Sequence, residues 1–301
     1  MSILLFDLNA AASLVDALAR RRGIELGELE QRRFPDGEAY VRLLSSVRDR
    51  DVVLLCSLDR PDAKAMSLLF AAAAARAQGA RSVGLAAPYL AYMRQDKAFK
   101  EGEAVTSETF AEIISRHFDW LVTLDPHLHR HSRLGEIYSI PAIAGTAAEE
   151  IGHWVRSEVE RPVIVGPDEE SRQWVEKIAA AASAPAVVLR KERSGDFHVS
   201  IGGEEPASFW GRTPVIVDDI VSTAATMIET VRVLREAGHA DPVCIAVHPI
   251  FAGESYARLL EVGPARVVST NCVAHESNAI DVSATLGLAI EEAVSRVRPV
   301  A

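Results

Sequence analysis

The sequence predicts an α/β protein in which mostly parallel β-sheets are flanked by helices. Short apolar runs rich in β-branched residues alternate with stretches of helical periodicity along nearly the whole chain. This alternation is typical of parallel strands joined by crossover helices. Hydrophobic residues make up 49% and charged residues 25% of the 301 residues, so the chain can bury a sizeable core. The length favours roughly two domains.

The first half of the chain opens with the apolar segment "MSILLFDLNAAASL". It carries Asp7 and has no basic start, so a first strand is favoured over a leader peptide. The elements expected next are a strand at 51–58, a helix at 62–80, a strand at 81–90, a helix at 107–118 and a strand at 119–127. The alanine-rich stretch 68–75 lies between Lys64 and Arg76, too closely flanked for a membrane span, and is expected to be a tightly packed helix.

The alternation restarts after residues 138–145. The expected helices are 147–159, 171–182, 223–238, 253–263 and 286–298, and the expected strands are 161–168, 184–193, 213–219, 241–251 and 265–273. A weak repeat relates "AQGARSVGLAAPY" (77–89) to "EAGHADPVCIAVHP" (236–249). Two related halves divided near residue 145 and a chance similarity between βα units both explain it. We expect domains at 1–145 and 146–301, with the last helix a candidate to pack on the first domain.

Charge and cysteine content narrow the class of protein. The net charge of −10 does not favour binding to nucleic acid or to an anionic membrane. It does not exclude a local basic site for a phosphorylated small molecule. Cys56, Cys244 and Cys272 are far apart and form no CxxC pattern. We interpret them as reduced, buried thiols of a cytoplasmic protein, not as a disulfide or zinc framework.

The stretch "PVIVDDIVSTAATM" (214–227) carries the clearest chemical signal. Asp218 and Asp219 follow an apolar run, and a turn with Ser222, Thr223 and Thr226 leads into the next expected helix. Ligands of parallel sheets bind beyond the carboxyl ends of the strands, and a helix N-terminus offers free N–H groups to an anion. A ligand with a phosphate at one end and hydroxyl groups or Mg²⁺ at the other, such as a sugar phosphate, suits both parts.

A structural interpretation of the same stretch is a capping box formed by Thr226 and Glu229, with the two aspartates solvated in a loop. It explains the threonine but not two carboxylates directly after "PVIV", because a buried unpaired carboxylate is costly. Neither GxxxxGK[ST] nor GxGxxG occurs in the chain. If the chain binds a nucleotide, its site must be built differently from the sites of these two motifs.

Five stretches together resemble a known family. "VIVDDIVSTAAT" is similar to the phosphoribosyl pyrophosphate loop of type I phosphoribosyltransferase folds. The other four narrow the resemblance to the ribose-phosphate pyrophosphokinase family, and they are "RRFPDGEAYVRL" (32–43), "PYLAYMRQDK" (88–97), "VTLDPH" (122–127) and "RKER" (190–193). They occur in the family's order, from residue 32 to residue 226. The resemblance implies two tandem type I phosphoribosyltransferase-like domains, each a mostly parallel sheet flanked by helices.

The resemblance also implies an activity, in which the diphosphoryl group of ATP passes to the C1 hydroxyl of ribose 5-phosphate with Mg²⁺ as cofactor, in a cytoplasmic homo-oligomer built from dimers. Phe34, Asp36, Glu38, Arg94 and Gln95 would bind ATP. Asp218, Asp219, Ser222, Thr223, Ala224, Ala225 and Thr226 would bind ribose 5-phosphate. His127 and Asp168 would hold Mg²⁺ directly or through water, and Lys191 and Arg193 would cover the transferring group.

The chain departs from the family at a few positions. Ser222 stands where an acidic residue is common, Ala224 and Ala225 stand where glycine is common, and Glu169 and Glu170 follow Asp168 in place of small residues. A non-catalytic regulatory paralogue and a phosphoribosyltransferase therefore stay open as alternatives. Blander interpretations also remain for single motifs: Arg94 and Asp96 as a solvated surface pair, and "HLHRH" (127–131) as a polar loop.

Overall fold

The computed structural model describes residues 2–189 and 209–297, which fall into two compact units. The first unit contains residues 2–145 together with 283–297, and the second contains the described residues between 146 and 282. Lys191 and Arg193 lie outside the described residues.

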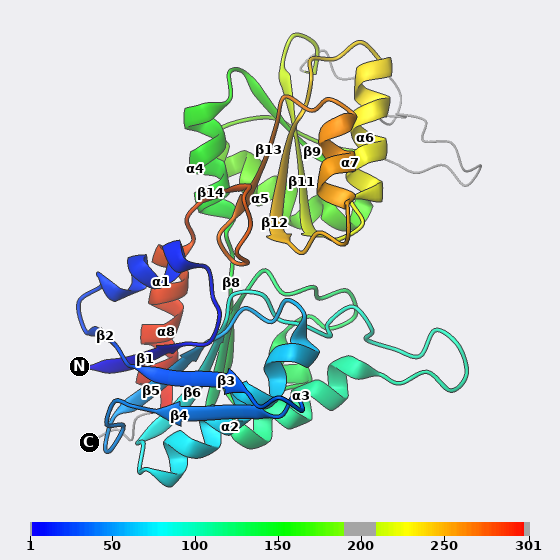
Figure 1. The fold of residues 1–301 in the computed structure, drawn as a ribbon. Coiled ribbons are helices and arrows are strands. Elements are labelled where there is room, and N and C mark those ends of the chain that lie inside the picture. Colours follow the sequence, from blue (N-terminus) through cyan, green and yellow to red (C-terminus); the bar gives the residue numbers. More distant parts are fainter. Residues whose placement is uncertain (1, 190–208, 298–301) are drawn as a thin grey trace. The chain divides into compact units, whose positions relative to one another are not determined.

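The first unit is built on a six-stranded parallel sheet of order β2-β1-β5-β6-β7-β8. Its strands are β1 (Ile3–Asp7), β2 (Ile24–Leu26), β5 (Asp51–Leu55), β6 (Ser82–Ala87), β7 (Trp120–Leu124) and β8 (Ala142–Gly145). Its helices are α1 (Ala12–Ala19), α2 (Pro61–Ala77), α3 (Thr106–His117) and α8 (Ser283–Val297). The last helix, α8, contacts α1 and the strands β6, β7 and β8, so the C-terminal helix completes the first unit (Figure 1).

The second unit repeats this construction with the sheet order β10-β9-β11-β12-β13-β14, again with every strand parallel. Its strands are β9 (Pro162–Gly166), β10 (Ala186–Val188), β11 (Thr213–Val221), β12 (Val243–Pro249), β13 (Arg266–Thr270) and β14 (Asn278–Ile280). Its helices are α4 (Ala148–Glu158), α5 (Arg172–Ala182), α6 (Ala225–Glu236) and α7 (Ser255–Glu261). Helices α4 and α5 cover one face of this sheet and α6 and α7 the other (Figure 1).

The two sheets have the same topology. Numbered by their order within each sheet, both sets of strands lie in the order 2-1-3-4-5-6. The similar segments 77–89 and 236–249 lead into β6 and β12, which are the fourth strand of their sheets. This correspondence favours two related halves over a chance similarity. In each sheet the strand order reverses between the first and third strands, which is where open α/β sheets bind ligands.

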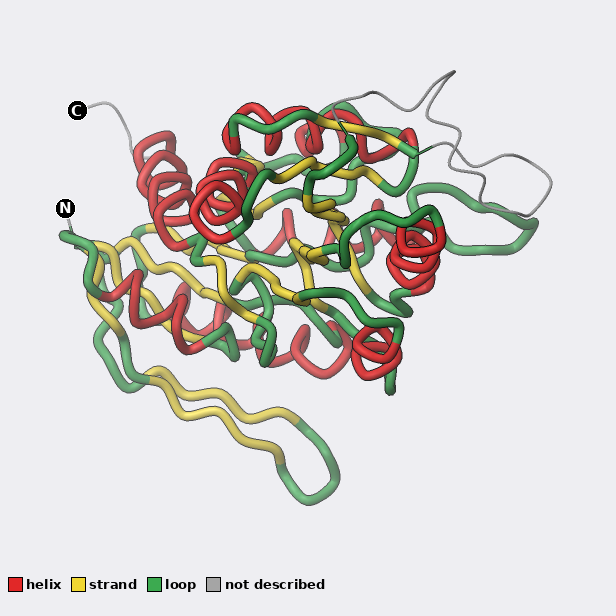
Figure 2. Tube along the Cα trace, turned by 90° about the horizontal axis from the view of Figure 1, so that it is seen from above, coloured by secondary structure: helices red, strands yellow, loops and turns green. Residues whose placement is uncertain are grey.

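A two-stranded antiparallel hairpin was not among the predicted elements. It consists of β3 (Leu29–Arg33) and β4 (Ala39–Leu43), and β4 contacts α2. Figure 2 shows the hairpin extending from the first unit with its turn at the far end. Residues 29–33 are partly or fully exposed, so the hairpin lacks the apolar alternation that marks a strand in a sequence.

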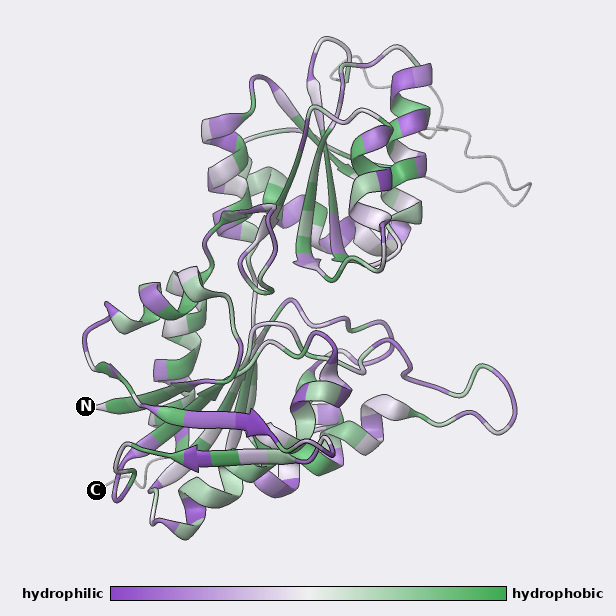
Figure 3. Cartoon of the chain, in the orientation of Figure 1, coloured by the Kyte–Doolittle hydropathy of each residue, from purple (hydrophilic) through white to green (hydrophobic). Residues whose placement is uncertain are grey.

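The strands of both sheets form the apolar interior of their units, whereas the helices are apolar only on the side that faces the sheet (Figure 3). In the alanine-rich part of α2, Ala71, Ala72 and Ala75 are fully buried, as expected for close packing. The three cysteines are buried and free, which confirms their interpretation as unpaired thiols. Within residues 2–189 and 209–297, no helix combines the length and apolarity that crossing a membrane requires.

Candidate active site

The reversal in strand order of the second unit lies between β9 and β11, and the predicted acidic residues lie on these two strands or directly after them. Asp168 comes two residues after the end of β9. Strand β11 does not end at residue 219 as expected but continues to Val221, because Ile220 and Val221 still pair with β12. The two aspartates are therefore part of the strand.

The two aspartates differ in their surroundings. Asp219 is buried, with 5% of its surface exposed, and its Oδ1 accepts a hydrogen bond of 2.7 Å from the N–H of Ile220. Asp218 is half-buried, and its Oδ1 accepts one of 3.1 Å from the N–H of Asp219. Burial, followed by the nearby carboxylates of Asp219 and Asp168, raises the pKa of Asp218 to about 8. Three carboxylates therefore gather at the carboxyl end of this sheet, where each disfavours the charge of the others.

We expect Asp218→Asn to stabilise the protein in a pH-dependent way. The pKa of Asp218 is higher in the folded chain, about 8, than its ordinary value of 3.8. The native state therefore favours the protonated acid, and this contribution to stability is complete below pH 3.8 and is lost as the pH rises through 8. Asparagine mimics the protonated form, so the variant should match wild type near pH 4 and exceed it above pH 8, by on the order of 2 kcal/mol. Urea denaturation at both pH values, without Mg²⁺, measures this; an equal effect at both would contradict it.

The turn after β11 leads directly into α6 and has the form of an anion site. Ala224 is the residue before the helix, so Thr226 lies inside the first turn and does not form a capping box with Glu229. Helix α6 also has no side-chain cap and no acidic residue in its first turn. The N–H groups of its first turn have no helical acceptor, and they coincide with the positive end of the helix dipole. Residues 222–226 can therefore surround a phosphate group.

A second loop of the same unit holds this turn, and sequence reasoning did not find it. The carbonyl oxygen of Ser222 accepts a hydrogen bond of 3.0 Å from the N–H of Ala252 and one of 2.7 Å from Oγ of Ser255. Ser255 is fully buried. The contact joins residues 33 apart, and a serine in a helical pattern gives no sequence signal for it. The β12–α7 loop thus fixes the start of the predicted phosphate-binding turn.

Ala224 adopts a backbone conformation that suits glycine, with φ of +58°. We expect Ala224→Val to destabilise the protein by about 2 kcal/mol or more, because a β-branched residue is strongly disfavoured in this conformation and the site is buried. The neighbouring Ala225→Val is the matched control: it adds the same two methyl groups at an exposed position of α6, where a change within about 0.5 kcal/mol is expected. Thermal unfolding of both variants measures the difference. Equal losses would show that the backbone at residue 224 is not constrained.

Asp168 is held by local hydrogen bonds in a position that suits a metal or its water ligands. Its Oδ1 accepts a hydrogen bond of 3.2 Å from the N–H of Ser171, at the start of the short 3₁₀ helix η2 (Glu169–Ser171). Glu169 forms a bidentate ion pair with Arg172, at 2.6 and 2.9 Å, so its charge is offset locally. Carboxylate oxygens are the ligands that Mg²⁺ prefers, and the mutual repulsion of Asp168, Asp218 and Asp219 fits a cation there.

In the first unit, the corresponding place at the carboxyl end of β5 lacks this arrangement of three carboxylates. After β5, the third strand of that sheet, the chain reads "CSLDRP", and Lys64 of α2 reaches back to it. Lys64 Nζ lies 2.6 Å from Oδ1 of Asp59 and 2.7 Å from the carbonyl oxygen of Ser57. Lys64 is thus paired with Asp59 in the first unit, whereas the second unit gathers three carboxylates at the corresponding place.

The predicted ATP segment of the first unit lies at the tip of the hairpin. Phe34 is 39% exposed, and Asp36 and Glu38 are exposed in the turn between β3 and β4. The turn is ordered by hydrogen bonds of 2.8 Å from the N–H of Phe34 to the Glu38 carbonyl and 3.1 Å from the N–H of Glu38 to Oδ1 of Asp36. Gly37, with φ of +95°, closes it. An exposed aromatic ring beside two carboxylates can stack on a base and accept hydrogen bonds from it.

The Arg32 guanidinium lies 4.5 Å from the centre of the Phe34 ring and 4.2 Å from that of Tyr40. It orients the Phe34 side chain, since cations favour the face of an aromatic ring. Sequence reasoning did not single out this arginine, although it stands within the quoted motif.

The alternative interpretation of Arg94 and Asp96 as a solvated surface pair is wrong. Asp96 is paired with Arg130 instead, at 3.2 Å, and the carboxylate of Asp96 is 7% exposed. Arg94 is exposed in the turn after β6 and has no carboxylate partner within residues 2–189 and 209–297. Gln95 is half-buried beside it. A free guanidinium at the carboxyl end of a strand can bind a phosphate oxygen.

The three alternating histidines after β7 do not form one cluster. The rings of His127 and His129 meet edge to face with centres 3.9 Å apart, whereas Nδ1 of His131 lies 3.3 Å from a carboxylate oxygen of Glu136. Among the described residues, no group of three or more His, Cys, Asp and Glu side chains is arranged to hold a metal ion by itself. A Mg²⁺ ion keeps several waters and substrate oxygens, so it does not need such a group.

Known proteins match the chain along nearly its whole length. Residues 3–117 match the N-terminal domain of ribose phosphate pyrophosphokinase, and residues 133–284 match the phosphoribosyl transferase domain. The ribose-phosphate pyrophosphokinases of Methanopyrus kandleri and Saccharolobus solfataricus are 34% and 31% identical to the chain. These alignments cover 91% and 94% of this chain and 94% and 98% of the relatives.

The fold has a close match among solved structures. The crystal structure of phosphoribosylpyrophosphate synthetase from Mycobacterium smegmatis superposes with a TM-score of 0.83 at 24% identity, covering 98% of this chain and 100% of that one. The repeated topology and the two matched family domains define a transferase with two phosphoribosyltransferase-like domains. The chain belongs to the ribose-phosphate pyrophosphokinase family. This membership supports the synthesis of phosphoribosyl pyrophosphate.

Proposed function

We propose that the chain transfers the diphosphoryl group of ATP to the C1 hydroxyl of ribose 5-phosphate in a Mg²⁺-dependent reaction, giving phosphoribosyl pyrophosphate and AMP. The C1 hydroxyl oxygen attacks the β-phosphorus of ATP and releases its proton. The bond from this phosphorus to the bridging oxygen of the α-phosphate breaks, and AMP leaves with that oxygen. The observation that carries the proposal is the gathering of three carboxylates on the strand that leads into the N-terminus of α6 and directly after the strand beside it.

The second unit supplies the site for ribose 5-phosphate in this proposal. The N–H and hydroxyl groups of residues 222–226 bind the 5-phosphate, because they lie at the positive end of a helix. Asp218 and Asp219 accept hydrogen bonds from the ribose hydroxyl groups. The two groups of residues lie at opposite ends of one short segment, which fixes the direction of the bound sugar.

The first unit supplies the groups for ATP. Phe34 stacks on the adenine, Asp36 and Glu38 bind the edge of the base or the ATP ribose, and Arg94 and Gln95 contact the nucleotide. We assign Mg²⁺ to His127 and Asp168, directly or through water, and when bound it offsets charge on the phosphoryl oxygens. Lys191 and Arg193, outside the described residues, are assigned by the family resemblance to cover the transferring group.

A coupled assay for AMP tests the proposal, with ATP and ribose 5-phosphate as the only substrates and Mg²⁺ as the added cofactor. We expect AMP and phosphoribosyl pyrophosphate in equal amounts, and neither when ribose 5-phosphate or Mg²⁺ is omitted. If the folded protein forms no AMP, the proposal fails and a non-catalytic paralogue is favoured. Light scattering during gel filtration tests the further proposal of a homo-oligomer built from dimers, which a monomer would contradict.

A further inference from the structure

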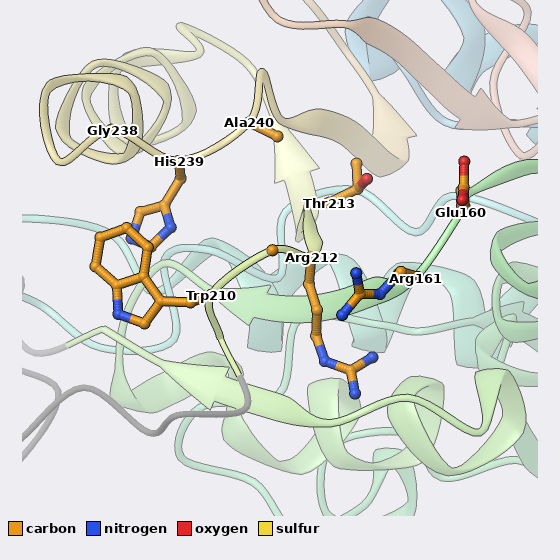
Figure 4. Close-up of a pocket in the computed structure, with 9 residues that line it drawn as sticks. Glu160, Arg161, Trp210, Arg212, Thr213, Gly238, His239 and Ala240 are labelled. Carbon is orange, nitrogen blue, oxygen red and sulfur yellow. The ribbon is translucent and has the colours of Figure 1, made fainter.

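A pocket lies at the amino ends of strands β9 and β11 in the second unit. Its volume is about 380 Å³, within the usual range for small-molecule sites. Its lining comes from three segments: 160–161 before β9, 210–213 at the start of β11, and 238–240 after α6 (Figure 4). The reaction site begins further along β11: at about 3.3 Å per residue, Asp218 lies roughly 16 Å and Val221 roughly 26 Å along the strand from Thr213. The pocket is therefore separate from the site proposed for the reaction.

One side of the pocket is cationic. The guanidinium groups of Arg161 and Arg212 lie on the same side of it (Figure 4). That of Arg161 covers Gly211, where an added Cβ would lie 3.7 and 3.8 Å from its two terminal nitrogens. Arg212 Nη1 lies 3.5 Å from the carbonyl oxygen of Pro162, and its other N–H groups have no acceptor among residues 2–189 and 209–297.

Neither guanidinium has a carboxylate partner within the described part of the chain. The carboxylate of Glu160, which also lines the pocket, lies apart from both (Figure 4). Two neighbouring cations without a counter-ion repel each other, in a protein whose net charge is −10. A doubly charged oxyanion would remove this repulsion and accept two forked sets of hydrogen bonds.

The other side of the pocket is aromatic. The rings of Trp210 and His239 overlap, with centres 4.7 Å apart and planes 32° apart. Phe209, fully buried, supports His239 from behind at 4.2 Å and nearly at right angles. Trp210 itself is 51% exposed, and it is the largest exposed apolar side chain among the described residues of this unit. A supported, exposed indole is a surface on which a flat ring can stack.

We propose that this pocket binds a flat heterocycle that carries a phosphate, such as a nucleoside monophosphate. The ring stacks on Trp210, and the phosphate binds Arg161 and Arg212. The proposal does not depend on the reaction assigned above, because none of these residues belongs to that site.

Tryptophan labelled with fluorine provides a direct test. The chain has four tryptophans, so 5-fluorotryptophan gives four ¹⁹F resonances, and Trp210→Phe identifies the one from residue 210. We expect AMP and UMP to shift this resonance saturably, and adenosine or inorganic phosphate alone to bind at least about tenfold more weakly. No shift at concentrations up to about 10 mM would overturn the proposal. Equal binding of phosphate alone would overturn the role of the aromatic side.

Substitutions inside and outside the pocket test where AMP binds. Arg161→Ala and Arg212→Ala should each weaken AMP binding about tenfold or more, whereas Arg212→Lys should retain part of it, because lysine keeps the charge but not the fork. Arg232→Ala, an exposed arginine of α6, is the control and should change nothing. The shift should also persist in Phe34→Ala, which removes the exposed ring proposed to stack on the adenine of ATP. If that variant abolished it, the resonance would be reporting the reaction site and the proposal would fail.

Discussion

Asp219→Asn should lower kcat/KM for ribose 5-phosphate by about 10²–10³-fold, since charge-assisted hydrogen bonds to two hydroxyl groups contribute about 1.5–3 kcal/mol each. Asparagine has the same size as aspartate, so the buried position stays filled. It also keeps one carbonyl oxygen, which can still accept the hydrogen bond from the N–H of Ile220. The variant therefore removes the charge while leaving the backbone of β11 in place. The AMP assay gives the rate, and calorimetric titration with ribose 5-phosphate gives the affinity.

The control for this variant is Asp241→Asn. Asp241 is an exposed aspartate of the same unit, paired with Arg235 at 2.9 Å, and the change should leave the rate unaltered. A folded Asp219→Asn protein with normal turnover would show that this carboxylate does not bind the sugar. If the variant binds ribose 5-phosphate normally but turns over slowly, Asp219 acts in the transfer step and not in sugar binding.

The alternation of apolar runs with helical patterns was enough to predict the parallel sheets, because buried parallel strands are continuous apolar segments. The hairpin at residues 29–43 escaped this reasoning because its strands are partly exposed and mostly polar. Its turn does carry a signal, the sequence Pro35-Asp36-Gly37, which is a common turn pattern between two strands. A search for turns, and not only for apolar periodicity, could have found it.

Some features of the candidate site could be predicted from local sequence patterns, and others could not. Local patterns placed Asp218 and Asp219 near the carboxyl end of a strand and the turn before a helix, since both depend on neighbouring residues. The left-handed backbone at Ala224 was not predicted; the one indication of it is that glycine is common at this position in the family. The ion pair of Asp96 with Arg130 and the hydrogen bond from Ser255 to Ser222 depend on contacts 34 and 33 residues apart. No local pattern encodes such contacts.

Gly84→Ala should destabilise the first unit by about 3 kcal/mol or more, the largest stability effect that we expect. Gly84 of β6 pairs directly with Trp120 of β7, and the fully buried indole lies over the glycine. A Cβ at residue 84 would lie 1.9 Å from Cε2 of Trp120, so the ring would have to leave its place. These two strands end at the loops that carry Arg94 and His127, so the same change should also reduce turnover with ATP.

Two further variants test whether the clash is the cause. Gly135→Ala is the matched control: this glycine of η1 (Leu134–Glu136) has open space where a Cβ would stand, so the change should be neutral within about 0.5 kcal/mol. Trp120→Leu removes the obstructing ring and should be destabilising by itself, because it leaves a cavity. In the double variant the new methyl group occupies part of that cavity, so the combined loss in urea denaturation should be smaller than the sum of the two single losses. Strict additivity would mean that residues 84 and 120 do not act on each other, and the clash would not explain the loss.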